Sequence, residues 1–305
     1  MHELILHHFD HSPFAEKVRL MLGLKGLAWR SVDISMVMPK PDLTALTGGY
    51  RKTPVLQVGA DVYCDTRLIA VELESRHPHP TLFPGGHRGV SLALSNWSDR
   101  AFFEPGAGLS MGLNKNGLPE AIINDRKAFF NFMDFGTLEQ DIPHLTTQLR
   151  AQADLVEQEL ADGREHFFGD VPGLADIQAY FVVWMARGNV PTAERIFAGR
   201  QRMLAWEGRM RGVGHGRRTP MEAADAHAIA RNAQPLAALG VDPDDPLGFR
   251  VGERVAVTPD DYGRDPVTGE LVTLVLHEVA VRRTDPKAGT VVVHFPRIGY
   301  RVARL

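Results

Sequence analysis

Residues 77–89 divide the chain, because this short stretch contains three prolines and three glycines. Proline lacks a backbone donor and clashes with the preceding turn, so no helix continues through the stretch. Before it, short apolar runs alternate with segments of helical spacing, and after it the spacing is helical for a long way. The sequence therefore predicts a first domain over residues 1–83 and an all-helical second domain over residues 88–236.

The first domain has the pattern of an α/β fold. Leu4 to His7 form a short apolar run, and Phe14, Val18 and Leu22 lie at helical spacing in the segment that follows. Further strands are predicted at residues 28–33, 54–58 and 62–64, the last two joined by a turn at 59–61, and a helix is predicted over residues 66–76. The predicted order is βαβ followed by ββα.

The rest of the chain changes pattern once more. No strand is expected between residues 90 and 235, and a Pro/Asp linker follows at 242–246. Residues 246–305 then alternate β-branched and polar residues, which predicts a small, separately cored all-β domain whose opening strand at 249–257 resembles SH3-like barrels. The predicted helices are 90–103, 119–134, 143–162, 174–187, 192–212 and 220–234.

Charge and cysteine content exclude several functional classes. The net charge is -3, so neither nucleic acid nor an anionic membrane is an expected partner, and the arginines between 195 and 218 are interpreted as a solvated helix face. The one cysteine, Cys64, rules out an internal disulfide and a cysteine zinc cluster. No signal peptide and no apolar run of about 20 residues is found, so a cytoplasmic location is expected.

Ser12 and Pro13 follow the first predicted strand directly. Serine at the N-cap and proline at the first helical position are good helix-start chemistry, and that structural explanation is sufficient on local grounds. The functional alternative is that a thiol beside Ser12 meets a hydroxyl donor and the positive end of the helix dipole. Both favour the thiolate.

Two other dipeptides suggest a ligand site. A cis peptide bond between Thr53 and Pro54 would turn the flanking backbone outward to pair with a peptide-like ligand, although few X-Pro bonds are cis. Asp65 and Thr66 open the next helix, where a helix N-terminus suits a ligand carboxylate and Asp65 suits an ammonium group. Capping alone also explains Asp65.

Residues 1–235 resemble the glutathione S-transferases. The resemblance rests on Ser-Pro-Phe-Ala-x-Lys-Val-Arg at 12–19, Lys-Thr-Pro-Val-Leu at 52–56 and Tyr-Cys-Asp-Thr-Arg-Leu-Ile at 63–69. In the helical half it rests on residues 167–177 and on the Trp-containing helix at 204–210. It implies a thioredoxin-like domain and an all-helical domain, and it does not cover residues 246–305. One departure is Gly173, which replaces the usual Ser or Thr N-cap, while Asp176 retains the acidic half of a capping box.

The resemblance also implies roles for individual residues. Ser12 takes the position of the residue that hydrogen-bonds the glutathione sulfur in serine-type transferases, and Val55 that of the backbone partner of the cysteinyl moiety. The glutathione-binding set contains the γ-glutamyl ligands Asp65 and Thr66, the glycyl-carboxylate candidates Lys40 and Lys52, and Thr53, Pro54 and Val55.

Other reactive side chains carry less weight. Cys64 is interpreted as a small buried hydrophobe, and strand alternation sends His7 and His8 to opposite faces, so no metal site is expected. His277 and His294 are expected to face inward on separate strands in a structural role.

The expected function is that of a homodimeric detoxification enzyme, a glutathione transferase with glutathione as its co-substrate. It would activate the thiol for attack on an electrophile bound near His11, Phe14, Trp97, Phe102 and Phe103. A glutathione-dependent disulfide or peroxide reductase and a non-catalytic binding protein are the alternatives. If the β domain is independent, a chain ending near Gly240 should remain soluble and bind glutathione. So small a domain is, however, expected to dock on the helical half or on a dimer partner, so that truncation keeps glutathione binding but alters thermal stability or substrate selectivity.

Overall fold

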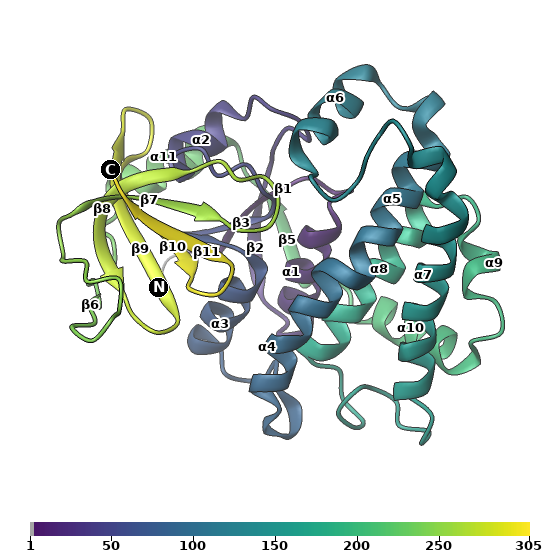
Figure 1. Cartoon of the computed structure of the whole chain (residues 1–305). Coiled ribbons are helices and arrows are strands. Elements are labelled where there is room, and N and C mark those ends of the chain that lie inside the picture. The colour runs from purple at the N-terminus through teal and green to yellow at the C-terminus, as the bar shows by residue number, and fades with distance from the viewer. Residues whose placement is uncertain (1–2) are drawn as a thin grey trace. The chain divides into compact units, whose positions relative to one another are not determined.

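The computed structural model describes residues 3–305 and contains two compact units (Figure 1). One unit combines the chain up to Ala15 with Ala28–Glu72 and Arg217–Leu305. The other combines Glu16–Leu27 with Leu73–Gly216. Each unit therefore unites segments that are far apart in the sequence, and the boundary passes through two helices, α1 (Pro13–Leu24) and α3 (Thr66–Arg76).

The first unit is built on a sheet whose first strands lie where the sequence predicts them. β1 pairs parallel with β2 and antiparallel with β3, and β3 continues into β4 through a hairpin. The predicted thioredoxin-like order of βαβ followed by ββα is confirmed. The strands are β1 (Ile5–His8), β2 (Ala28–Asp33), β3 (Val55–Val58) and β4 (Asp61–Cys64).

Two features of this unit differ from the sequence expectation. A short helix, α2 (Pro41–Thr47), precedes the β3 hairpin, and β5 (Arg217–Pro220) pairs parallel with β2 at the edge of the sheet. The expectation that residues 90–235 contain no strand is therefore wrong. Because β5 and α11 (Ala223–Asn232) belong to the first unit, the helical half ends at Gly216 rather than near residue 236.

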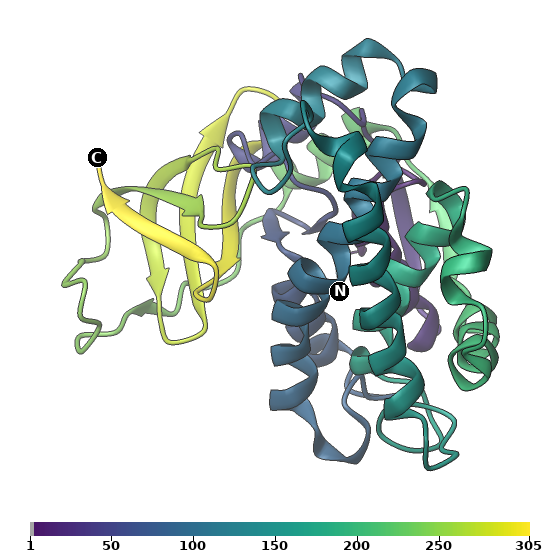
Figure 2. The same cartoon turned by 45° about the vertical axis from the view of Figure 1, so that its right-hand side comes forward.

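The C-terminal residues form the predicted small all-β region, visible as the curled green and yellow strands of Figure 2. β10 pairs parallel with β4, so the order β11-β7-β8-β9-β10 continues directly into β4-β3-β1-β2-β5. Within the region neighbouring strands run antiparallel, and a two-residue strand, β6 (Gly240–Val241), pairs with β8. The main strands are β7 (Arg254–Pro259), β8 (Val267–Leu274), β9 (Glu278–Asp285), β10 (Gly289–Pro296) and β11 (Tyr300–Arg304).

The C-terminal strands share one hydrophobic core with the thioredoxin-like strands. Val55, Val62 and Cys64 from β3 and β4 pack in the same buried cluster as Val293 and Phe295 from β10. The expectation of a separate core for residues 246–305 is therefore wrong. The physical reason is size: about 60 residues bury little apolar surface alone, and docking on β4 supplies the missing contacts.

His294 joins the two parts of this sheet. Its Nε2 donates to Asp61 Oδ1 (3.0 Å) on β4, its Nδ1 donates to Glu278 Oε1 (2.7 Å) on β9, and its ring stacks on Tyr63. Both acceptors are carboxylates, so the ring carries both protons. Burial lowers the pKa of His294, but the hydrogen bonds and charges of Asp61 and Glu278 outweigh burial and raise it to about 9. His277, by contrast, is exposed in the β8–β9 loop and does not face inward.

This cluster predicts a specific pH dependence of stability. A pKa that is raised in the folded state stabilises the fold fully below the unfolded value of about 6.5 and stops doing so as the pH rises through about 9. The contribution lost over that window is on the order of 3 kcal/mol. Chemical denaturation between pH 6 and 10 should show this decline, and His294→Gln should flatten it. His277→Gln is the matched control, and an equal slope in both variants would contradict the assignment.

The second unit is helical. Lys17 of α1 is fully buried in it, paired with Asp99, with its Nζ 4.2 Å from the centre of the Phe181 ring, so this cation of the Ser12–Arg19 motif has a structural role. Beyond part of α1, the elements are α4 (Arg88–Asn96), a π-helical segment (Trp97–Phe102), α5 (Phe103–Asn114), α6 (Glu120–Phe129), α7 (Leu138–Glu159), α8 (Leu174–Asn189), α9 (Ala193–Phe197), α10 (Gln201–Gly212) and short 3₁₀ turns at Pro84–Gly86 and Lys115–Gly117.

Gly173 at the start of α8 is explained by a close backbone approach. An added Cβ would lie 2.5 Å from Pro84 Cδ and 3.1 Å from Leu82 O, so a serine or threonine side chain does not fit. The helix start is nevertheless satisfied. Asp176 Oδ2 accepts from Gly173 N (3.0 Å) as predicted, and Leu174 N donates to Leu82 O (2.7 Å). Among residues 3–305, no helix has the length and apolar character needed to cross a membrane.

Candidate functional site

The strand register brings the three predicted motifs to the same end of three neighbouring strands in the first unit's sheet. His7 lies opposite Val55, and Val55 lies opposite Cys64, so these residues share one rung across β1, β3 and β4. Ser12 follows the end of β1, Thr53 and Pro54 precede the start of β3, and Asp65 follows the end of β4. Two helix N-termini and one strand start are thereby placed together.

Ser12 is the N-cap that the sequence predicts. Its Oγ accepts a hydrogen bond from Ala15 N (3.2 Å), and Pro13 is the first residue of α1. The residue is 2% exposed. Within residues 3–305 the Ser12 O–H proton has no acceptor, so capping uses the lone pair of the oxygen and leaves its donor capacity unused. The hydroxyl can therefore donate to a ligand while it caps the helix.

The Thr53–Pro54 peptide bond is cis. Thr53 is partly exposed and lies just outside β3, whereas Val55 is fully buried in β3 between β1 and β4. Val55 thus has no strand edge open to a ligand, contrary to the backbone role implied by the resemblance. The backbone of Thr53, next to the cis proline, lies outside the sheet.

Asp65 has a backbone conformation that favours a functional interpretation. Its φ of 78° lies in the left-handed region, and among residues 3–305 Asp65 alone has a positive φ without being a glycine. Its Oδ1 accepts from Arg67 N (2.8 Å) at the start of α3. Thr66 is 5% exposed, and within residues 3–305 no hydrogen bond is formed by its hydroxyl. The helix start therefore offers an acidic and a hydroxyl group.

Tyr300 of β11 holds the Asp65 carboxylate. Its hydroxyl donates to Asp65 Oδ2 (3.2 Å) and lies 3.0 Å from Tyr50 Oη. Burial, followed by the Asp65 charge, raises the pKa of Tyr50 well above its usual value, and burial likewise raises the pKa of Tyr300. Both phenols therefore remain hydrogen-bond donors. No local motif identifies Tyr300, which is 235 positions from Asp65.

The two predicted lysines are both engaged within the first unit. Lys40 is 6% exposed, and its Nζ donates to Arg51 O (3.0 Å) and Thr53 Oγ1 (3.2 Å), so it braces the segment before the cis proline. Lys52 Nζ pairs with Asp261 Oδ1 (2.5 Å) and lies 4.4 Å from the centre of the Tyr262 ring. Asp261 and Tyr262 come from the β7–β8 loop, and sequence motifs do not identify them.

The residues predicted to hold an electrophile fall in both units. His11 is exposed and Phe14 half-buried in the first unit. In the helical unit Phe102 is fully buried, Phe103 nearly so, and Trp97 stacks on Phe102 while its Nε1 donates to Gln152 Oε1 (2.7 Å). Phe102 therefore packs in the interior of that unit and presents no surface to a ligand.

The other reactive side chains of the first unit are committed to packing. Cys64 is fully buried, and burial raises the pKa of its thiol well above the usual range, so it forms little thiolate. His7 Nε2 bonds Gln57 Oε1 (2.8 Å) and His8 Nε2 bonds Ser31 Oγ (2.9 Å), which agrees with their predicted separation. Burial lowers the pKa of His7 to about 4, so it is neutral.

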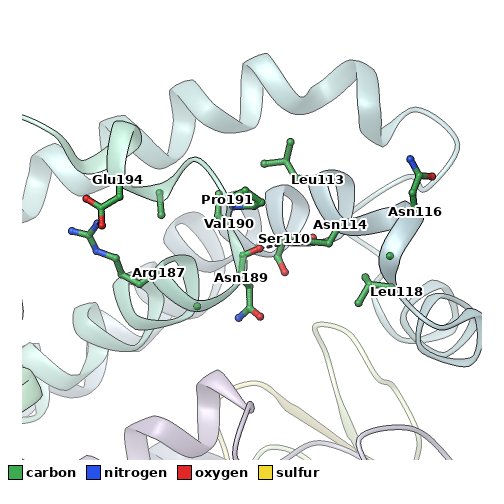
Figure 3. A pocket seen from close by; sticks show the side chains of 13 residues that line it. Ser110, Leu113, Asn114, Asn116, Leu118, Arg187, Asn189, Val190, Pro191 and Glu194 are labelled. Carbon is green, nitrogen blue, oxygen red and sulfur yellow. Dashed lines mark hydrogen bonds and ion pairs between the residues drawn. The ribbon is translucent and has the colours of Figure 1, made fainter.

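The helical unit has a cavity of its own, of about 630 Å³, between the end of α5 and the α8–α9 connection (Figure 3). Asn114 Nδ2 donates to Ser110 O (2.8 Å) and to Asn189 O (2.6 Å), and Arg187 pairs with Glu194 and Glu207. These polar groups bond one another, so the cavity shows no set of groups directed at a ligand.

Family models match both halves of the predicted architecture. Residues 6–81 match the glutathione S-transferase N-terminal domain, and residues 139–209 match the glutathione S-transferase C-terminal domain. A GST-like protein from Pseudomonas syringae, known from its crystal structure, is 38% identical, with 100% of both chains covered and a TM-score of 0.82. The chain therefore belongs to the glutathione S-transferase family, and the full-length match includes the C-terminal strands.

Other solved structures are similar over part of the chain. A glutathione S-transferase from Rhodospirillum rubrum is 22% identical over 68% of this chain and 87% of its own, with a TM-score of 0.52. FzlA from C. crescentus is 26% identical over 68% of this chain and 87% of its own, with a TM-score of 0.51. No curated protein matches the chain.

Proposed function

We propose that this protein binds glutathione at the sheet edge formed by Ser12, Thr53–Pro54 and Asp65–Thr66, and activates its thiol for attack on an electrophile. The observation that carries the proposal is the Ser12 hydroxyl, which caps α1 while its proton has no acceptor within residues 3–305. A thiolate beside it would accept that proton in a hydrogen bond and would face the positive end of the helix dipole.

The remaining contacts follow from the same geometry. The cysteinyl backbone of the ligand would pair with the backbone of Thr53, which lies outside the sheet beside the cis proline. The γ-glutamyl carboxylate would lie at the N-terminus of α3 beside the Thr66 hydroxyl, and its ammonium group beside Asp65. Tyr300 would keep the Asp65 carboxylate in place. The C-terminal end of the ligand would then lie toward Lys52 and Lys40.

Transfer to an electrophile is favoured over a reductase function because position 12 is serine. A cysteine there would permit a mixed disulfide with the protein, whereas serine can only donate to the thiolate. The family and the site therefore support a transferase, with the electrophile wall formed by residues such as Phe14 and His11. We further propose a homodimeric, cytoplasmic enzyme of detoxification, with glutathione as co-substrate and without a metal. Assays with an aryl halide and with a glutathionyl disulfide separate the two activities.

Asp65→Ala tests the ligand-binding part of the proposal. Glutathione should raise the melting temperature of the wild-type protein, because a ligand of the folded state stabilises it. Removing the Asp65 carboxylate should reduce glutathione affinity about ten- to a hundredfold, as expected for a lost hydrogen bond to a charged group. Thermal shift and calorimetric titration measure both effects.

Cys64→Ala is the neighbouring control, because the Cys64 side chain is fully buried in the hydrophobic core of the first unit and bonds no ligand in this scheme. It should lower stability but leave the glutathione affinity nearly unchanged. Equal losses of affinity in the two variants would show that this edge of the sheet is not the ligand site.

A further inference from the structure

The β7–β8 loop, residues 260–266, brings carboxylates to the two cations that precede the cis proline. Asp261 Oδ1 lies 2.5 Å from Lys52 Nζ, and Asp265 Oδ2 lies 4.0 Å from Arg51 Nε. The Lys52 side chain is 13% exposed and the Asp261 side chain 28%, so the pair is partly shielded from water. Arg51 and Lys52 are thus each paired with a carboxylate within the protein.

The arrangement is fixed by several independent contacts. Tyr262 is 8% exposed, and the centre of its ring lies 4.4 Å from Lys52 Nζ. Asp260 N donates to Gly299 O (2.9 Å). Arg264 donates to the backbone carbonyls of Asp261 (2.9 Å) and Asp260 (2.8 Å). The loop is therefore anchored at Lys52 and Gly299 and stabilised internally by Arg264, and Asp261 has a defined position beside Lys52.

We infer that the site prefers a γ-glutamyl-cysteinyl thiol peptide whose C-terminal carboxylate is masked, as an amide or ester, over free glutathione. This inference rests on the proposed glutathione-type site. With the thiol at Ser12 and the γ-glutamyl end at Asp65–Thr66, the opposite end of the peptide lies toward Lys52. A free carboxylate there would meet Asp261 as a like charge and would have to compete with it for Lys52. A neutral end meets no such repulsion.

The test compares glutathione with its glycyl monoethyl ester by calorimetric titration of the full-length protein. The wild-type protein should bind the ester about tenfold or more tightly than glutathione, because the ester lacks the charge that Asp261 repels. Asp261→Asn should raise the affinity for glutathione by a similar factor and remove the preference, because Lys52 then becomes available to the carboxylate. Asp244→Asn, an exposed position with the same change in net charge, should behave as wild type.

The titrations distinguish a failure of this inference from a failure of the proposed function. Tighter binding of glutathione than of the ester by the wild-type protein would overturn the inference and leave the proposed function intact. An unchanged preference in Asp261→Asn, with its melting temperature preserved, would likewise overturn it. Binding of neither ligand to the wild-type protein would refute the proposed function and this inference together. The wild-type comparison needs no variant, so it decides the matter even where Asp261→Asn does not fold.

Discussion

A chain that ends at Gly240 is expected to lose the folded state of its first unit and to accumulate as insoluble protein. The reason is the shared core: the cluster that contains Val55, Val62 and Cys64 would lose the side chains of the C-terminal strands, and β4 would become an open sheet edge. Large buried apolar side chains contribute about 1.5–3 kcal/mol each, so removal of a core built mostly from residues after Phe249 exceeds the usual stability of a domain. An exposed apolar edge also promotes aggregation.

Expression followed by fractionation and circular dichroism measures this effect. Co-expression of residues 1–240 with residues 241–305 is the control, because it restores the missing strands without the covalent link. If a soluble complex is recovered, the loss of solubility is caused by the missing core residues and not by the break in the chain. A soluble truncated chain that still binds glutathione would instead support a β domain with a core of its own.

The strands and helices with strong local signals were predictable. The apolar run after Leu4, the spacing of Phe14, Val18 and Leu22, and the hairpin around Gly59 each indicate their element within a few residues. β5 gives no such signal. Its residues are all exposed and it has only an edge pairing with β2, so alternation is absent. The seven-residue helix α2 is likewise short, and Lys40 provides no side-chain cap.

The partition of the chain depends on contacts that local pattern does not encode. Residues after Gly216 return to the first sheet, through β5 on one edge and β10 on β4. The alternating pattern of residues 246–305 correctly predicts strands. It does not reveal that their buried face is completed by Val62 and Cys64, because alternation reports that a face is buried and not what covers it.

The residues of the candidate site likewise divide into those with a local sequence signal and those without one. Ser12, Thr53–Pro54 and Asp65–Thr66 were identified because each lies at an element boundary, where capping and proline chemistry leave a local signature. Tyr300 and Asp261 were not, since each meets its partner across more than 200 positions. Lys52 was identified by its place before the cis proline, but its pairing with Asp261 could not be.

Ser12→Ala is expected to reduce turnover ten- to a hundredfold at saturating glutathione and to change glutathione affinity much less. Its hydroxyl would act on the sulfur alone, and a lost hydrogen bond to a charged group is worth about 1.5–3 kcal/mol. The same loss should raise the pKa of the bound thiol by about one to two units, which thiolate ultraviolet absorbance measures without knowledge of the electrophile. Loss of the cap at Ala15 N should also cost about 1 kcal/mol of stability.

The matched control for this variant is Ser35→Ala, because Ser35 is exposed and bonds only its own turn through Val37. It should leave turnover, thiol pKa and stability close to wild type. Ser12→Ala with a lowered melting temperature but an unchanged thiol pKa would mean that Ser12 is only a helix cap. His11, the exposed neighbour on the same loop, would then be the candidate donor to the sulfur. A raised pKa with unchanged affinity would instead separate the two roles of this hydroxyl, the lone pair serving the helix and the proton serving the thiolate.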